Sequence, residues 1–141
     1  MVKTINDFQL LSVRSLEGIF HGKSEYFDEG KWFEVHNPTI ESMKLSRGCI
    51  AGTSALKQGF LIGGRDDTRI VPYVWKIDFS KSPVQWTRAS SLNNRRHGHS
   101  CGVVTIKKKY YVVAVAGISD EHYTRNPSVI LLRQTRENNR N

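Results

Sequence analysis

Residues 47–86 read RGCIAGTSALKQGFLIGGRDDTRIVPYVWKIDFSKSPVQW and contain the strongest structural signal in the chain. Short runs of apolar and β-branched residues alternate here with turn residues, as in 60–62 before Gly63-Gly64 and 71–79 before Ser82-Pro83. Runs of this length, bounded by glycine, proline and serine, are typical of antiparallel strands. Helical periodicity is weak, so these residues predict a small all-β unit.

The markers of this unit recur elsewhere in the chain. Four pairs of markers are separated by 49 to 54 residues: Arg47 with Arg96, Gly63-Gly64 with Ala116-Gly117, Asp28 with Asp78, and Trp32 with Trp86. A period of about 50 residues is typical of β-propellers and related repeat architectures. The sequence therefore predicts a repeated sheet rather than one continuous sheet.

The order of these markers resembles the kelch repeat: an arginine, a small-residue strand, an apolar strand ending in Gly-Gly, a strand ending in an apolar-Asp pair, and a tryptophan. The resemblance implies a partial kelch-type β-propeller of about two to two and a half four-stranded antiparallel blades. The residues assigned to the repeat are Asp28, Trp32, Gly63, Gly64, Asp78, Trp86 and Gly117. The segments expected are an N-terminal extension or degenerate blade piece (1–23), kelch-like blades (24–132, divided into 24–37, 47–90 and 96–132) and a polar tail (133–141).

The two cysteines occupy matching small-residue strands. Cys49 lies in 49–56 and Cys101 in 99–106, where crowding near a propeller axis favours small side chains. Structural buried cysteines are usually inert, so both are expected to be reduced thiols on the innermost strands. With no apolar run of signal-peptide or membrane-span length, the expected location is cytoplasmic.

The sequence gives little support for catalysis, metal binding or cofactor binding. His97 and His99 lack further convergent ligands in the sequence, and Gly63-Gly64 is followed by neither a phosphate-loop pattern nor a helix start. No nucleophile elbow is present. We therefore expect no enzyme activity, no catalytic residues, no metal and no cofactor.

Charge is unevenly distributed along the chain. The formal net charge is +8, and residues 71–141 account for all of it. Such a basic half favours acidic partners, or serves simply as a solvated surface. Lys107, Lys108 and Lys109 fall in an expected hairpin turn, where a solvated cluster is the ordinary case.

Strand order in a four-stranded blade predicts which loops share one end. Those loops hold the candidate partner-binding residues Arg65, Arg69, Arg95, Arg96, Tyr123 and Arg125, with the three turn lysines at the opposite end. Arginine and tyrosine are enriched at interface hot spots. The expected function is a protein–protein interaction scaffold, as kelch proteins often are adaptors, with an acidic segment of another protein as partner.

Two alternatives stay open, a fragment of a propeller enzyme such as an oxidase and a basic nucleic-acid-binding module. We expect neither a membrane nor a nucleic acid as partner. Further kelch blades or self-association would cover the open strand edges.

Overall fold

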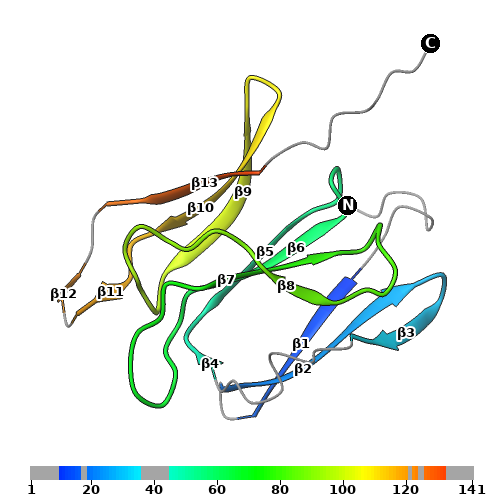
Figure 1. Cartoon of the computed structure of the whole chain (residues 1–141), viewed down its shortest axis with the longest axis horizontal. Helices are drawn as coiled ribbons and strands as arrows, with labels where there is room; N and C mark the ends of the chain where they lie inside the picture. The colour runs from blue at the N-terminus through cyan, green and yellow to red at the C-terminus, as the bar shows by residue number, and fades with distance from the viewer. Residues whose placement is uncertain (1–9, 17–18, 36–44, 121, 124–125, 133–141) are drawn as a thin grey trace.

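The computed structural model describes residues 10–16, 19–35, 45–120, 122–123 and 126–132 (Figure 1). Their regular structure is entirely β, and they contain no helix, which confirms the all-β prediction. A helix with the length and hydropathy of a membrane span is accordingly not found among them. The strands form several antiparallel sheets, of which three are the main ones.

The central sheet has the strand order β5-β6-β7-β8. Its strands are β5 (Cys49–Thr53), β6 (Gln58–Ile62), β7 (Val74–Asp78) and β8 (Trp86–Arg88). Each strand pairs antiparallel with the next, so the sheet is a simple meander. It falls within 47–90, the range expected to hold one full copy of the repeat.

The C-terminal sheet has the order β13-β10-β9, which is the arrangement of the central sheet without its fourth strand. It consists of β9 (Ser100–Ile106), β10 (Lys109–Val115) and β13 (Ser128–Leu132). A short hairpin, β11 (Ile118–Ser119) and β12 (His122–Tyr123), lies in the connection from β10 to β13 and is not predicted by the sequence.

The N-terminal sheet has the order β1-β2-β3, with β4 paired to β2. Its strands are β1 (Leu10–Leu16), β2 (Ile19–Asp28), β3 (Lys31–Glu34) and β4 (Leu45–Ser46). The segment 1–23, in which no repeat is recognised from sequence, thus contributes β1 and the first half of β2.

Markers that are equivalent in sequence hold equivalent places in the sheets. Trp32 pairs with Phe27 across β2 and β3, and Trp86 pairs with Ile77 across β7 and β8. The two residues that follow β6 and the two that follow β10 have the same left-handed backbone conformation. Gly63, Gly64, Ala116 and Gly117 all have positive φ (58°, 106°, 60° and 88°). The spacing of about 50 residues therefore corresponds to a repeated backbone geometry.

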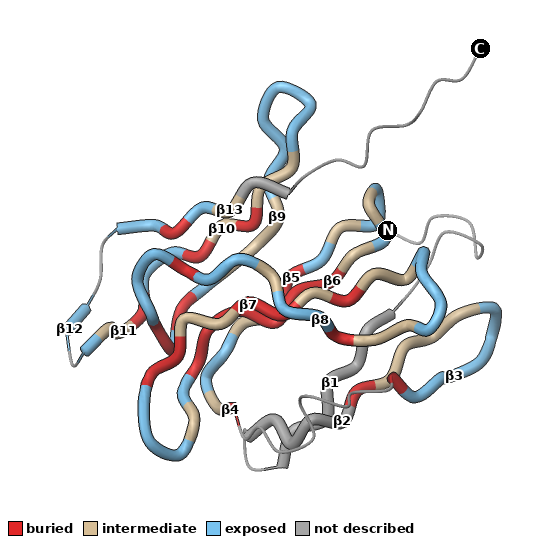
Figure 2. The backbone as a smooth tube through the Cα atoms, in the orientation of Figure 1, coloured by how far each residue is buried: buried red, intermediate tan, exposed pale blue. Residues whose placement is uncertain are grey.

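The three sheets lie in a row and enclose two hydrophobic clusters (Figures 1 and 2). The first lies between the N-terminal and central sheets and includes Val35, Leu61, Ile77 and Trp86. Trp86 is buried there, and its indole Nε1 donates a hydrogen bond to Ser24 Oγ of β2 at 2.8 Å. The large ring on the outer strand thus ties two sheets together.

The second cluster lies between the central and C-terminal sheets. Phe60, Ile62 and Val74 of the central sheet pack there with Val112 and Ala114 of β10. Along β10 the buried residues Val112 and Ala114 alternate with less buried ones, as expected of a strand with one covered face. The middle sheet is therefore covered on both faces by its neighbours.

The expectation of reduced cysteines is wrong, because Cys49 and Cys101 form a disulfide. Their strands, β5 and β9, come from neighbouring sheets, and the two Cα atoms are 6.0 Å apart, within the usual range for disulfides. Matching positions in successive repeats suggested equivalent environments, but the two strands in fact face each other. The cytoplasmic location stays a prediction.

Candidate binding groove

Three loops from different parts of the chain meet at one end of the strands. They are the β6–β7 loop (63–73), the β8–β9 loop (89–99) and the segment 116–120, which contains β11. Backbone hydrogen bonds join them: Gly64 N–H donates to Arg96 O, and His97 and Ile118 exchange bonds of 2.9 and 3.1 Å. Because the links are between backbones, the relative placement of the loops is independent of their exposed side chains.

Gly63 and Gly64 make the first of these links possible. A Cβ on Gly63 would lie 2.7 Å from the carbonyl oxygen of Arg96, and one on Gly64 would lie 2.9 Å from that of Ser46. Both residues also have positive φ, which glycine adopts without steric cost. The pair is therefore a turn that lets two other segments approach closely, as the sequence predicts.

Asp66 shapes the loop that follows. Its Oδ1 accepts hydrogen bonds from the backbone N–H groups of Thr68 and Arg69, at 2.8 and 2.7 Å, and from the Thr68 hydroxyl. Partial desolvation raises its pKa, but the hydrogen bonds from Thr68 and Arg69 outweigh it, so the pKa is lowered overall. An ionised Asp66 thus holds the loop that presents Arg69.

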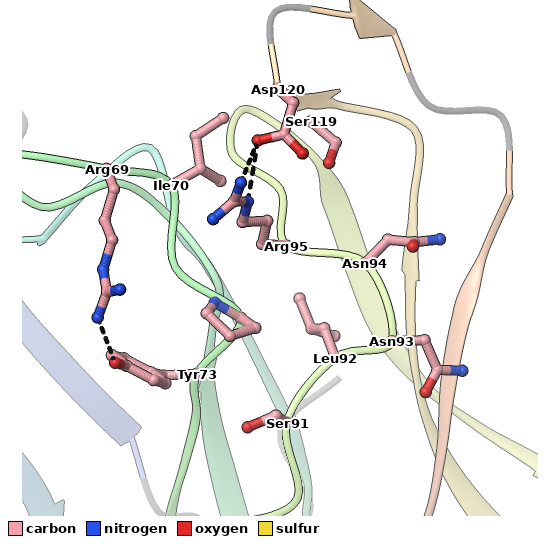
Figure 3. A pocket seen from close by; sticks show the side chains of 11 residues that line it. Arg69, Ile70, Tyr73, Ser91, Leu92, Asn93, Asn94, Arg95, Ser119 and Asp120 are labelled. Atoms are coloured by element: carbon pink, nitrogen blue, oxygen red, sulfur yellow. Dashed lines mark hydrogen bonds and ion pairs between the residues drawn. The ribbon is translucent and has the colours of Figure 1, made fainter.

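Between these loops lies a groove of about 500 Å³ (Figure 3). Arg69, Ile70 and Tyr73 line it from the β6–β7 loop, and Ser119 and Asp120 from β11 and the turn after it. The β8–β9 loop contributes the remaining wall, which consists of Ser91, Leu92, Asn93, Asn94 and Arg95. A smaller hollow of about 330 Å³ shares Arg69 and Arg95 and adds Arg65 and Thr68. The surface is polar and basic, with Leu92 buried beneath it.

Two of the groove arginines already have partners within the chain. Arg95 forms an ion pair with Asp120, with Nη2 2.6 Å from Oδ1 and Nε donating to the same oxygen at 2.9 Å. Arg69 Nη2 donates to the hydroxyl of Tyr73 at 3.0 Å. Both contacts are solvent-exposed, so they orient the guanidinium groups but are weak enough for a partner to replace.

Arg96 does not belong to this surface, and its assignment as a partner-binding residue is wrong. Its side chain is fully buried. Its guanidinium donates to four backbone carbonyls and a hydroxyl, namely Asn94 O, Ala114 O, Ala116 O, Asn126 O and Ser128 Oγ, at 2.7 to 3.5 Å. Burial lowers its pKa, but an arginine remains charged. Arg96 is a structural residue that joins the β8–β9 loop to β10 and β13.

The structure brings together three of the predicted partner-binding residues, namely Arg65, Arg69 and Arg95. Tyr123, on β12, is 87% exposed but does not line the groove, and Arg125 lies outside the described residues. Sequence reasoning missed Tyr73, and it missed Asp120 as a counter-charge. Asp120 falls in a loop assigned to this end, so counting its carboxylate would have identified it.

His97 and His99 do not line the groove, and both are buried. Burial and the charge of Arg96 lower the pKa of His99 to about 4. Burial, followed by the charges of Arg47 and Arg65, also lowers the pKa of His97. Both histidines are thus neutral packing residues at pH 7, and the described ranges hold no cluster of three or more metal-ligating side chains.

Fold and groove define an all-β protein of stacked antiparallel sheets with a basic loop surface at one end. No protein-family model matches the sequence, and no curated protein does. Among the 106 chains of known structure that match is that of YjhT, with a TM-score of 0.51 and 14% identity. The match covers 68% of this chain and 27% of that one, so the chain spans about a quarter of YjhT. At this identity the likeness concerns the fold alone.

Proposed function

We propose that this chain is part of a kelch-type β-propeller and that it is a protein-binding scaffold, whose loop groove contacts an acidic segment of another protein. The repeated sheet geometry supports the first part, since Phe27–Trp32 and Ile77–Trp86 hold the same register in two sheets. Stacked four-stranded meanders are the building units of propellers.

The observation that carries the binding function is the convergence of three loops on one groove. Arg69 and Arg95 are more than twenty residues apart in sequence and belong to different loops, yet both line it. Loops held by a rigid scaffold are the usual place for recognition. The groove is too open and polar to favour a small apolar ligand, whereas a peptide segment could lie along it.

Arginine chemistry favours carboxylates as the ligand groups. A guanidinium can bind a carboxylate through two parallel hydrogen bonds, which specifies geometry as well as charge. Arg65 and Arg69 are exposed at the smaller hollow, and Arg95 already binds a carboxylate, since its Nε and Nη2 both contact Oδ1 of Asp120. A carboxylate of the partner would compete with Asp120 for Arg95.

A displayed library of random peptides, selected against the chain, tests this function. We expect enrichment of peptides containing Asp and Glu. The double substitution Arg65→Ala with Arg69→Ala should weaken a selected peptide about 30-fold, which corresponds to roughly 2 kcal/mol for lost charge-assisted hydrogen bonds.

The control is Lys107→Ala with Lys108→Ala, which removes the same charge from the turn between β9 and β10. This variant should bind the peptide within about twofold of the unmodified chain. Equal losses in both variants would show that net charge alone governs binding, and no enrichment of acidic peptides would contradict the proposed partner.

A further inference from the structure

One face of the C-terminal sheet is apolar and open to solvent. Register places residues of β9, β10 and β13 on this face in cross-strand contact: Val104 lies opposite Tyr111, and Val113 lies opposite Val129. Val104, Ile106, Val115 and Val129 are 41%, 55%, 41% and 50% exposed. We call Val104, Ile106, Tyr111, Val113, Val115 and Val129 the aliphatic face. Contiguous exposed apolar patches of this kind mark interaction surfaces.

Comparison with the central sheet shows what kind of surface would pack on the aliphatic face. Val115 immediately precedes Ala116-Gly117, just as Ile62 immediately precedes Gly63-Gly64, and Val113 and Phe60 lie two residues earlier in each case. Phe60 and Ile62 are fully buried, because they form the face by which the central sheet packs on the C-terminal sheet. The aliphatic face is therefore the same position in the next sheet, and among the described residues no further sheet covers it.

The opposite end of the row shows the complementary half of the contact. Tyr26 of β2 packs toward the central sheet, so side-chain alternation points Phe27 and its cross-strand partner Trp32 the other way. Their rings contact each other with centroids 5.4 Å apart, and Trp32 is 51% exposed. Their counterparts Ile77 and Trp86 are buried against the preceding sheet. We call Phe27 and Trp32 the aromatic face.

We propose that a second copy of this chain binds through these two surfaces, with the aliphatic face of one copy on the aromatic face of the other. Each end of the row then repeats the contact that already joins the sheets within one chain. The association is head-to-tail, so it closes into a ring or extends into a filament according to the rotation between copies. This inference goes beyond the peptide groove and involves none of its residues.

Charge at the turns supports the same pairing. At the turn between β2 and β3, Asp28 and Glu29 outweigh Lys31, so this turn is acidic, whereas Lys107 and Lys108 lie at the turn between β9 and β10. Both turns are on the side of the molecule away from the groove loops (Figure 1). Head-to-tail stacking would therefore bring acidic and basic turns to the same side of the contact, which favours this orientation.

Sedimentation equilibrium of the full chain across a concentration series tests the proposal. We expect reversible self-association, weakened at least tenfold by Val104→Asp and by Trp32→Ser. The matched control is Thr105→Asp, because Thr105 is an exposed neighbour on β9 whose side chain alternates to the other face. Circular dichroism verifies folding, and Val129→Asp replaces Val104→Asp if the latter unfolds.

Mixing the two variants distinguishes head-to-tail from symmetric association. The Val104→Asp chain retains its aromatic face and the Trp32→Ser chain retains its aliphatic face, so an equimolar mixture should form a one-to-one dimer. A chain that stays monomeric at all concentrations, a loss with Thr105→Asp equal to that with Val104→Asp, or no dimer in the mixture would each overturn the proposal.

Discussion

Arg95 and Arg96 are neighbours in sequence, but their side chains have different environments. Arg95 is 45% exposed in its ion pair with Asp120, whereas Arg96 is fully buried among carbonyl oxygens. Adjacent residues in an extended segment point to opposite sides, so one side chain reaches the groove and the other enters the core. Arg95 is thus the member of the pair that can contribute to binding, and Arg96 is the one that contributes to stability.

Replacing Arg96 by alanine should destabilise the fold by about 3 kcal/mol or more, because several buried carbonyls would lose their donor and a cavity would remain. Urea denaturation measures this loss. Arg95→Ala is the control, and it should cost less than about 1 kcal/mol, since an exposed ion pair contributes little. Similar losses in the two variants would contradict the structural role of Arg96.

Stability should fall as the pH decreases from about 6.5 to 4, in part because of His99. Its pKa is about 4 in the folded chain and about 6.5 when unfolded, so in this range the unfolded state binds the extra proton. The contribution is complete above the unfolded pKa, is lost by about pH 4, and amounts to about 3 kcal/mol.

The pH profile of the free energy of unfolding, compared between the unmodified chain and His99→Asn, tests this. The difference between the profiles should be confined to the range between the two pKa values. An unchanged slope in His99→Asn would show that His99 titrates normally.

The turns that follow the apolar strands β6 and β10 are the elements that most constrain the backbone. Gly63-Gly64 ends β6, and Ala116-Gly117 occupies the same place after β10. A Cβ on Gly117 would lie 2.7 Å from His97 O, so glycine is required there. Ala116 instead holds an exposed left-handed conformation that costs an L-residue free energy.

Two substitutions in this turn should therefore have opposite signs. Ala116→Gly should stabilise the chain by about 0.5 kcal/mol, since relief of the strained φ exceeds the entropy added to the unfolded state. Gly117→Ala should destabilise it by about 2 kcal/mol or more. Thermal melting compares both with the unmodified chain, and a lower melting temperature for Ala116→Gly would contradict the turn geometry.

At the scale of the whole molecule, three sheets are held in a row by two apolar clusters and one covalent bond. The disulfide joins β5 and β9, which belong to neighbouring sheets. Cysteines 52 residues apart close a large loop, so the cross-link restricts the unfolded chain considerably.

Removing the disulfide should lower the free energy of unfolding by about 4 kcal/mol on the chain-entropy model. Cys49→Ser with Cys101→Ser, or the reduced chain, should show this loss by urea denaturation. Intact mass under non-denaturing, non-reducing conditions should be lower by two hydrogens than that of the reduced chain. Two freely alkylated thiols in the native protein would contradict the cross-link.

The sequence alone was sufficient for the all-β class and for the position of most strands in 24–132, because apolar runs and turn residues are local signals. The turn at Gly63-Gly64 was predictable for the same reason. So was the order in which an apolar-Asp pair at the end of one strand is followed by a tryptophan. Loop ends could also be grouped from strand order, which placed Arg65, Arg69 and Arg95 together.

Only the tertiary structure decided which side chains face each other. The burial of Arg96, the pairing of Asp120 with Arg95, and the disulfide between Cys49 and Cys101 all depend on contacts between separate sheets and loops. Repetition in sequence shows that two residues hold equivalent positions, but it carries no information on whether those positions touch. That depends on how the sheets stack, because packing is set by all the side chains between them.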